Sequence, residues 1–162
     1  QTIDSAMLNA VLDRYLGAFG IRTSDIVLNV DTTDRKGFRT LRYLQIVRGI
    51  KVVGSNLSVS IAASGDVRYI SNNLTDEHAN FNPRQTVTRA NANAIALANS
   101  PWLRNSVATA SDVPEIRLDN ITGNIWYTHK VDIRDANNVL RLSVYVDAEN
   151  GSVLASFPGL IH

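Results

Sequence analysis

Apolar residues recur at helical spacing near the start of the chain. In the segment DSAMLNAVLDRYLGAFG, residues 4–20, one apolar stripe contains Met7, Leu8, Val11, Leu12, Tyr15 and Leu16. Spacings of three and four residues place these side chains on one side of a helix. Asp4 or Ser5 can cap its start, and Gly17 or Gly20 can end it. The segment therefore predicts an amphipathic helix that packs against a core.

The pattern then changes to alternation, which predicts strands. The expected strands are DIVLNVD, FRTLRYLQIV, two short runs that Gly49 and Gly54 separate, Leu57–Ala62 and Val67–Ser71. A polar loop, Thr32–Gly37, lies between the first two strands. Ser64-Gly65-Asp66 predicts a hairpin turn between the last two.

The same order repeats in the second half. The polar stretch NNLTDEHANFNPRQ is the best candidate for a linker, and TVTRANANAIALANS predicts a second helix. Thr86 or Thr88 can cap this helix, and Ser100-Pro101 ends it. Its apolar face is mostly alanine with Ile95 and Leu97, so it can lie close to a sheet. The predicted strands that follow are EIRLD, NIWYTHKVDI, LRLSVYVD and SVLASF.

Helices followed by strands with hairpin-length connections favour an α+β fold with antiparallel pairing. We expect two antiparallel sheets, each packed by one main helix. The corresponding division is a subdomain at residues 1–76, a linker at 77–85, a second subdomain at 86–157 and a C-terminal tail at 158–162.

Composition excludes several classes of function. The 162 residues include 16 basic and 15 acidic side chains, a formal charge of +1, and no cysteine. A nucleic-acid partner normally requires clustered basic residues, so none is expected. No apolar run approaches 18 residues, so no membrane-spanning helix is expected. The absence of cysteine removes disulfides, thiolate nucleophiles and cysteine metal sites.

Catalytic motifs are also missing. His78, His129 and His162 do not share metal-ligand spacing, and HExxH, GxSxG, Walker and GxGxxG motifs are absent. We interpret His129 as a solvated or hydrogen-bonded strand residue. Four acidic residues, Asp31, Asp34, Asp147 and Glu149, are interpreted as turn residues rather than calcium ligands. The sequence therefore predicts no catalytic residue and no cofactor of its own.

Two segments resemble known families. LRYLQIVRGIKVVGSNLSVSIAASGDVRYISNNL resembles the core of the propeptide domain, FTP, found in fungalysin and thermolysin precursors. The matching positions are Tyr43, Gln45, Gly49, Ile50, Val52, Gly54, Val59, Ile61, Gly65 and Val67. IWYTHKVDIRDANNVLRLSVYVDAENGSVLASF is similar to the PepSY repeat. Its matching positions are Tyr145, Val146, Asp147, Ala148, Gly151, Val153 and Leu154. The first half is thus FTP-like and the second half PepSY-like.

The ending FPGLIH resembles the junction in pseudolysin and vibriolysin precursors, where an aromatic-x-Gly-Leu-x-His stretch precedes the mature protease. Pro158 departs from that pattern, in which an acidic residue is expected. The start at Gln1 suggests trimming by a signal peptidase, although an engineered boundary would look the same. With the resemblance to precursors of secreted proteases, we expect a secreted or periplasmic location.

The resemblance implies a prosegment that helps its own zinc metalloprotease to fold and inhibits it after autocleavage. His162 would lie on the acyl side of the scissile bond, with its new α-carboxylate at the catalytic zinc of the partner. Leu160 and Ile161 would fill apolar subsites, and Gly159 would let the backbone pass closely through the cleft. The implied partner is the mature catalytic domain, held in a non-covalent complex.

An alternative is a free-standing PepSY-type module that binds or regulates another protease or envelope partner. For a prosegment, the tail alone would bind as weakly as a product, so inhibition needs a second, larger contact on the folded body. Trp126, Tyr127 and Tyr145 are candidates for it, although each could equally belong to the core.

Overall fold

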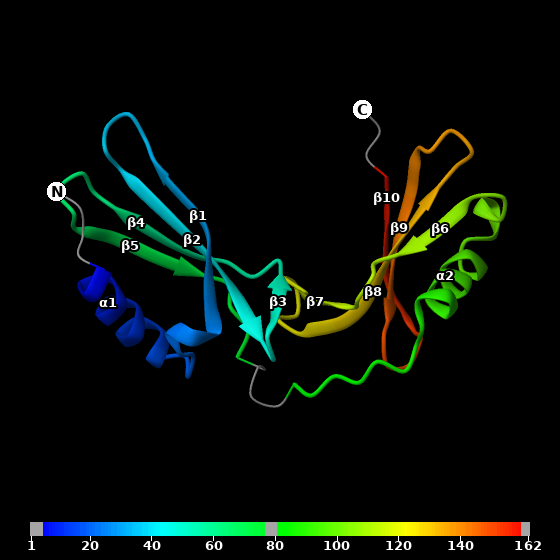
Figure 1. Cartoon of the computed structure of the whole chain (residues 1–162), viewed down its shortest axis with the longest axis horizontal. Coiled ribbons are helices and arrows are strands. Elements are labelled where there is room, and N and C mark those ends of the chain that lie inside the picture. The colour runs from blue at the N-terminus through cyan, green and yellow to red at the C-terminus, as the bar shows by residue number, and fades with distance from the viewer. Residues whose placement is uncertain (1–4, 77–80, 160–162) are drawn as a thin grey trace. The chain divides into compact units, whose positions relative to one another are not determined.

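The computed structural model describes residues 5–76 and 81–159. Its chain forms two compact units, which interleave in sequence (Figure 1). The first contains residues 1–81 and 118–125, and the second contains residues 82–117 and 126–162.

The first unit is built from a helix and a set of antiparallel strands. The helix is α1 (Ser5–Gly17), and a short 3-10 turn, η1 (Thr23–Asp25), leads into the strands. The strands are β1 (Ile26–Thr33), β2 (Arg39–Val47), β3 (Ile50–Val53), β4 (Leu57–Ile61) and β5 (Val67–Asn72). Strand β2 pairs antiparallel with β1, β3 and β4, and β4 pairs antiparallel with β5. The hairpin predicted at Ser64-Gly65-Asp66 is confirmed, because Ala62 N–H donates to the Asp66 carbonyl at 2.8 Å.

One side of α1 covers this sheet, as the apolar stripe predicted. Leu12 and Leu16 are buried and pack with Leu41, Leu57, Val59 and Ile61. Met7, which the stripe also included, is 62% exposed. The helix starts only at Ser5, so Met7 lies in its first turns, where the core does not reach.

The second unit repeats the arrangement. It has helix α2 (Arg89–Ala98) and a 3-10 turn, η3 (Pro101–Leu103). Its strands are β6 (Val107–Ala110), β7 (Glu115–Leu118, the last residue of which belongs to the first unit), β8 (Ile125–Arg134), β9 (Leu140–Asp147) and β10 (Val153–Pro158). The pairs β6–β8, β8–β9 and β9–β10 are antiparallel. Sequence patterning did not predict β6.

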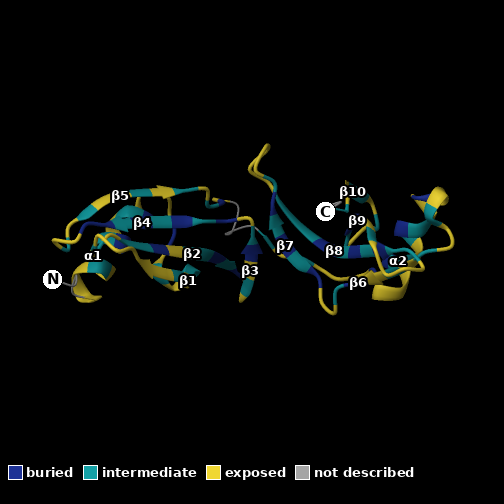
Figure 2. Ribbon diagram, turned by 90° about the horizontal axis from the view of Figure 1, so that it is seen from above, coloured by how far each residue is buried: buried dark blue, intermediate teal, exposed yellow. Residues whose placement is uncertain are grey.

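Helix α2 is short and lies close to its sheet, as its alanine content predicted. Thr88 is the N-cap, because its side chain accepts a hydrogen bond from Asn91 N–H at 3.1 Å. Thr86, the other candidate, instead donates its hydroxyl to the Glu149 carbonyl. Ala92 and Ala96 are fully buried against Val131, Ile133, Val144 and Val146. In Figure 2 the buried stretches fall mainly on the strands.

The expectation of two separate antiparallel sheets is wrong. Within residues 5–76 and 81–159, the strands belong to one ten-stranded sheet with the order β10-β9-β8-β7-β3-β2-β4-β5, to which β1 and β6 are added through β2 and β8. Sequence patterning assigned the short strands β3 and β7 to separate halves, because four-residue strands carry no information about a distant neighbour.

The acidic residues behave largely as turn formers. Asp34 Oδ1 accepts hydrogen bonds from Lys36 N–H and Phe38 N–H, and Asp147 Oδ1 accepts from Glu149 N–H. Asp31 does not follow the prediction, because it lies within β1 and pairs with Arg39. A turn role for Asp147 is therefore confirmed, and one for Asp31 is wrong.

Candidate functional site

Gly159 is the last residue of the chain that the structure describes, and the folded body holds it tightly. Its N–H donates to the Arg141 carbonyl at 3.0 Å, which extends the β10–β9 pairing by one residue. A Cβ at this position would overlap the Leu140 carbonyl group. Only glycine fits there without a shift of the backbone. The other predicted tail residues, Leu160, Ile161 and His162, lie outside the described residues.

Pro158 belongs to the folded body, since it ends β10 in register with Leu142. Strand β10 ends the strand order of the sheet, so it is an edge strand. In antiparallel pairs the hydrogen-bonding positions alternate, and Gly159 bonds toward β9. The ring nitrogen of Pro158 therefore faces away from β9, where a missing N–H breaks no ladder bond. The root of the tail is consequently an ordered edge strand.

Tyr145 and Phe157 form an aromatic pair beside this root. Their rings meet edge to face, with centroids 5.8 Å apart. Tyr145 is only 4% exposed, whereas Phe157 is 52% exposed. The guanidinium of Arg117 lies 4.5 Å from the centroid of the Tyr145 ring, and its Nε is 3.3 Å from Glu115 Oε1. Tyr145 is thus enclosed between a cation and a second ring, which fixes its position.

This aromatic pair lies on the sheet face that α2 does not cover. Alternation along β9 places Tyr145 opposite to Val144 and Val146, both of which pack against α2. Phe157 is in register with Ser143, and paired residues share a face. We refer to this surface, defined by Arg117, Arg141, Ser143, Tyr145 and Phe157, as the open face of the second unit.

A shallow hollow of about 320 Å³ lies near strands β6 and β8 and is lined by Thr109, Ala110, Ser111, Lys130, Asp132 and Arg134. Ser143 donates its hydroxyl to Asp132 Oδ1 at 2.7 Å, which links the hollow to the open face. The lining is polar and carries both signs of charge, as in the rim of a protein interface.

The aromatic residues proposed for docking occupy different environments. Trp126 and Tyr127 are half-buried in β8, and Tyr145 is buried in β9. Sequence reasoning missed Phe157 and Arg117. The available signal for Phe157 was an aromatic residue directly after the small residues Ala155 and Ser156, near the end of a predicted strand. Arg117 gave no signal, because its position over a ring depends on tertiary structure.

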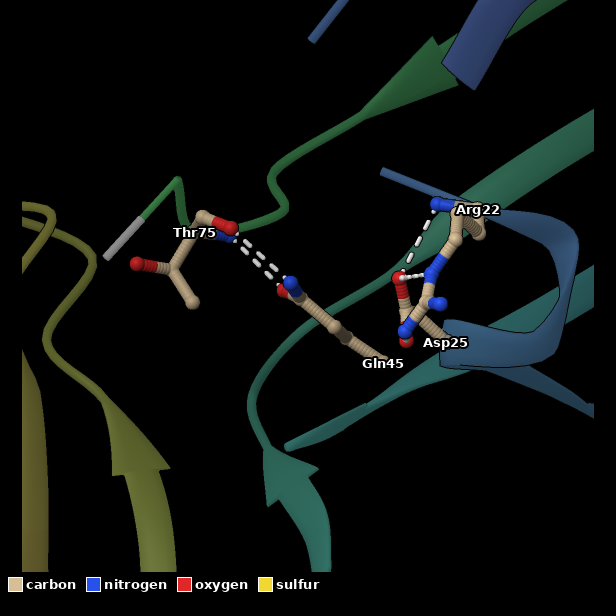
Figure 3. A network of polar contacts seen from close by, with 4 residues as sticks. All are labelled: Arg22, Asp25, Gln45 and Thr75. Carbon is tan, nitrogen blue, oxygen red and sulfur yellow. Dashed lines mark hydrogen bonds and ion pairs between the residues drawn. The ribbon is translucent and has the colours of Figure 1, made fainter. Parts of the chain in front are cut away.

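The residues that carry the FTP resemblance are mostly structural. Gly49, Gly54 and Gly65 have positive φ angles of 77°, 88° and 94° and lie in turns. Val52, Val59 and Ile61 are buried. The Gln45 side chain bonds the backbone of Thr75, within the same unit (Figure 3). These positions therefore shape the unit and supply no reactive group.

A second hollow, of about 600 Å³, belongs to the first unit. Its lining residues are Gly20, Arg22, Ser24, Asp25, Ile46, Val47, Arg48 and Gly49. Arg22 and Asp25 are bound to each other, as Figure 3 shows, with Arg22 N–H 3.0 Å from Asp25 Oδ2. Arg48 Nε–H donates to the Phe81 carbonyl at 3.0 Å. The charged groups of this hollow are thus engaged by the chain itself.

The histidine at position 129 has a structural role. It is fully buried, and its Nε2 lies 2.7 Å from the Val87 carbonyl. A carbonyl only accepts hydrogen bonds, so Nε2 carries a proton that is donated to Val87. The interpretation as a hydrogen-bonded strand residue is confirmed, and the solvated alternative is wrong.

His78 lies outside the described residues. Within residues 5–76 and 81–159, no group of three His, Asp or Glu side chains could hold a metal ion.

Asp31 and Arg39 form a closer ion pair, at 2.8 Å, than Arg22 and Asp25, at 3.5 Å, in the described part of the first unit. Arg39 Nε–H and Nη2–H donate to Asp31 Oδ1 and Oδ2 at 2.9 and 2.8 Å, a two-pronged geometry. This hydrogen bonding, with the charge of Arg39, lowers the pKa of Asp31. At Asp119 the hydroxyl of Thr122 and the N–H of Ile121 lower the pKa of the carboxyl in the same way.

Comparisons with known proteins agree with part of the resemblance. Residues 25–74 match the family described as the Fungalysin/Thermolysin Propeptide Motif. The comparison with curated proteins gives no match. None of the helices in the described part of the chain has the length and hydropathy to cross a membrane.

Two solved structures are loosely similar. The Bacillus megaterium YpeB C-terminal domain has a TM-score of 0.41 and 12% identity, with 99% of this chain and 68% of that chain covered. A putative lipoprotein from Clostridium difficile 630 has a TM-score of 0.34 and 18% identity, with 96% and 92% covered. The family match to a protease propeptide motif is therefore the comparison that bears on function.

Proposed function

We propose that this chain is the prosegment of a secreted zinc metalloprotease, which it helps to fold and then inhibits. The match of residues 25–74 to a propeptide motif carries the proposal. The catalytic zinc belongs to the partner, and the chain contributes no cofactor. A propeptide acts by binding, so its chemistry lies in the groups that it presents to the enzyme.

The inhibitory element in this proposal is the tail from Gly159 to His162. His162 is the acyl-side residue of the cleaved bond, and its α-carboxylate binds the partner's zinc. A carboxylate is a suitable zinc ligand and supplies negative charge to a dication. Leu160 and Ile161 occupy apolar subsites of the cleft.

The geometry of Gly159 supports this proposal. A short tail on a free peptide would bind weakly, as a product does. Here the root of the tail is held by the Arg141 carbonyl and by the close approach to Leu140. Holding the root lowers the entropy that the tail loses on binding and raises its effective concentration.

The test is inhibition in trans. The chain is added to a panel of thermolysin-family endopeptidases, with thermolysin as the reference, and cleavage of a fluorogenic peptide is measured. We expect inhibition of at least one enzyme, and loss of it when residues 160–162 are removed. Equal inhibition by the truncated chain would show that the tail does not act at the zinc. Inhibition of none would remove the proposed function.

A semisynthetic pair separates the carboxylate from the imidazole. A chain that ends in the α-carboxamide of His162 keeps the side chain and loses the charge. The variant His162→Ala keeps the α-carboxylate and loses the imidazole. If the carboxylate binds the zinc, the carboxamide should weaken inhibition at least tenfold, and His162→Ala should change it less than threefold. The reverse order would show that the side chain is the zinc ligand.

The folding role is measured separately. A denatured catalytic domain of the inhibited enzyme is diluted into buffer with and without the chain, and recovered activity is followed after the chain is removed by proteolysis. We expect a higher yield with the chain present. An unchanged yield alongside intact inhibition would favour the alternative, a regulatory PepSY-type binding module.

A further inference from the structure

We infer that a docking patch around Phe157, on the open face of the second unit, contacts the rim of the partner's active-site cleft. The patch consists of Phe157 and Arg141 of the open face and of Val139 in the adjoining β8–β9 connection, with Tyr145 and Arg117 behind Phe157. The inference rests on the proposed function, because that function places the end of the tail inside the cleft. The patch is the surface of the folded body that the enzyme must contact.

The length of the tail limits where the enzyme can lie. In the proposed function the cleaved bond follows His162, three residues after Gly159. An extended chain spans at most 3.3–3.6 Å per residue, so the α-carboxylate formed there can reach at most about 11 Å from Gly159. An enzyme whose cleft receives that carboxylate must therefore bring its rim to the surface immediately around Gly159. The residues that contact Gly159 are Leu140 and Arg141 of β9, and Gly159 itself directly follows β10.

Phe157 is the apolar group best placed to meet that rim. It precedes Gly159 by two residues in the same edge strand and is 52% exposed. Val139, 48% exposed, lies in the β8–β9 turn directly before Leu140, whose carbonyl group adjoins Gly159. Two exposed apolar side chains thus flank the root of the tail. Arg141, whose carbonyl accepts the Gly159 N–H, adds a charged group, 53% exposed and 3.9 Å from Asp135.

The residues behind Phe157 hold its ring in place, which suits an anchor residue of an interface. Its ring rests against Tyr145, which Arg117 holds from another strand, and Glu115 in turn holds Arg117. A side chain that is already ordered loses little entropy on binding. Aromatic residues and arginine at the centre of an interface usually carry much of its binding energy. The polar hollow at Lys130, Asp132 and Arg134 fits the rim of such an interface.

The alternative occupant would be a second copy of this chain paired along β10. Pro158 opposes that arrangement, because its missing N–H interrupts the outward edge of the strand. The apolar patch together with the short tail therefore favours the enzyme.

The experiment compares Phe157→Ala with Ser156→Ala in the inhibition assay, using the panel enzyme that the wild-type chain inhibits most strongly. Ser156 is a matched control, because it is exposed, adjacent, and in register with Val144, on the other face. We expect the inhibition constant to rise at least tenfold for Phe157→Ala and less than twofold for Ser156→Ala, with unchanged thermal midpoints.

Three further outcomes are decisive. If Phe157→Ala inhibits like the wild type, the patch is wrong while the proposed function stands. If both variants weaken inhibition equally, Phe157 is no anchor, and the patch is again wrong. If the wild-type chain inhibits no enzyme of the panel, the proposed function itself fails.

Should Phe157→Ala not fold, Arg117→Met provides the second measurement. This change keeps Phe157 and removes the charge over the Tyr145 ring. A rise of the inhibition constant of threefold or more supports the patch, and no change contradicts it. Analytical ultracentrifugation of the free chain tests the other occupant, and a dimer that Phe157→Ala dissociates would overturn the assignment to the enzyme.

Discussion

The side-chain amide of Gln45 makes two hydrogen bonds to the backbone of Thr75. Nε2 donates to the Thr75 carbonyl, and Thr75 N–H donates to Oε1, both at 2.8 Å. The two residues are 0% and 2% exposed. The amide thus pairs with a distant segment as a neighbouring strand would. It fixes the segment that follows β5 against β2.

Replacing Gln45 should therefore destabilise the fold. Gln45→Leu keeps the size of the side chain and removes both bonds in a buried place. We expect the free energy of unfolding to fall by about 1–3 kcal/mol. Urea denaturation followed by circular dichroism measures it. Gln85→Leu, at an exposed site, is the control and should change the value by less than about 0.5 kcal/mol. A loss of the same size in the control would contradict a specific role for Gln45.

Gly159→Ala should displace the root of the tail. The new Cβ would overlap the carbonyl oxygen and carbon of Leu140. These are backbone atoms, so they cannot move aside as a flexible side chain could. We expect the amide at position 159 to lose its protection from hydrogen exchange, since its bond to Arg141 breaks. Inhibition in trans should weaken by fivefold or more while the thermal midpoint stays within a few degrees. Gly17→Ala is the control, because a Cβ there meets nothing within 4 Å. Unchanged protection in Gly159→Ala would refute the close approach.

His129→Leu tests how the segment before α2 is attached. The Nε2–H of His129 bonds the Val87 carbonyl, while Val87 N–H bonds the Ala148 carbonyl at 2.9 Å. Removing the first bond inside the core should cost about 1–3 kcal/mol of unfolding free energy. His129→Gln retains a donor and should recover part of the loss. If His129→Leu and His129→Gln had equal free energies of unfolding, the hydrogen bond would contribute no net stability and only packing would matter.

Local patterns predicted most elements of this fold, and the reason is clear at particular residues. Alternation located β2 and β8, because buried positions recur on one face of each, and it located β9 because apolar and more polar residues alternate along it, although both faces of β9 are buried between Leu142 and Val146. The Thr88 cap and the Asp147 turn are local hydrogen bonds that neighbouring residues determine. Strand β6 escaped prediction because its sequence, VATA, has small side chains with little contrast between its faces.

The features that sequence did not predict depend on residues far apart in the chain. Gln45 and Thr75 are 30 residues apart, and the resemblance marked only the first of them. Arg117 meets Tyr145, and Tyr145 meets Phe157, through strands whose register includes a bulge between Val153 and Ala155. No local pattern contains that information. The single sheet escaped prediction for the same reason.

The pair of Asp31 and Arg39 should make stability depend on pH in the acidic range. Hydrogen bonding to Arg39 lowers the pKa of Asp31 in the folded state. A lowered pKa adds stability above the unfolded value of about 3.9, and this stability is lost as the pH falls through the lower folded value. The side chains are 39% and 29% exposed, so solvent screens the pair. We expect Asp31→Asn to lose about 0.5–1 kcal/mol at pH 7.

That difference between wild type and Asp31→Asn should shrink below about pH 4, because the wild-type carboxyl becomes protonated first in the unfolded chain and, at lower pH, in the folded chain. Urea denaturation at pH 7, 5, 4 and 3 measures it. In the background of Arg39→Met, the change Asp31→Asn should cost nothing further at any of these values, since the partner is gone. A difference that stays constant from pH 7 to pH 3 would mean that the charge of Asp31 contributes nothing and that its loss acts through packing alone.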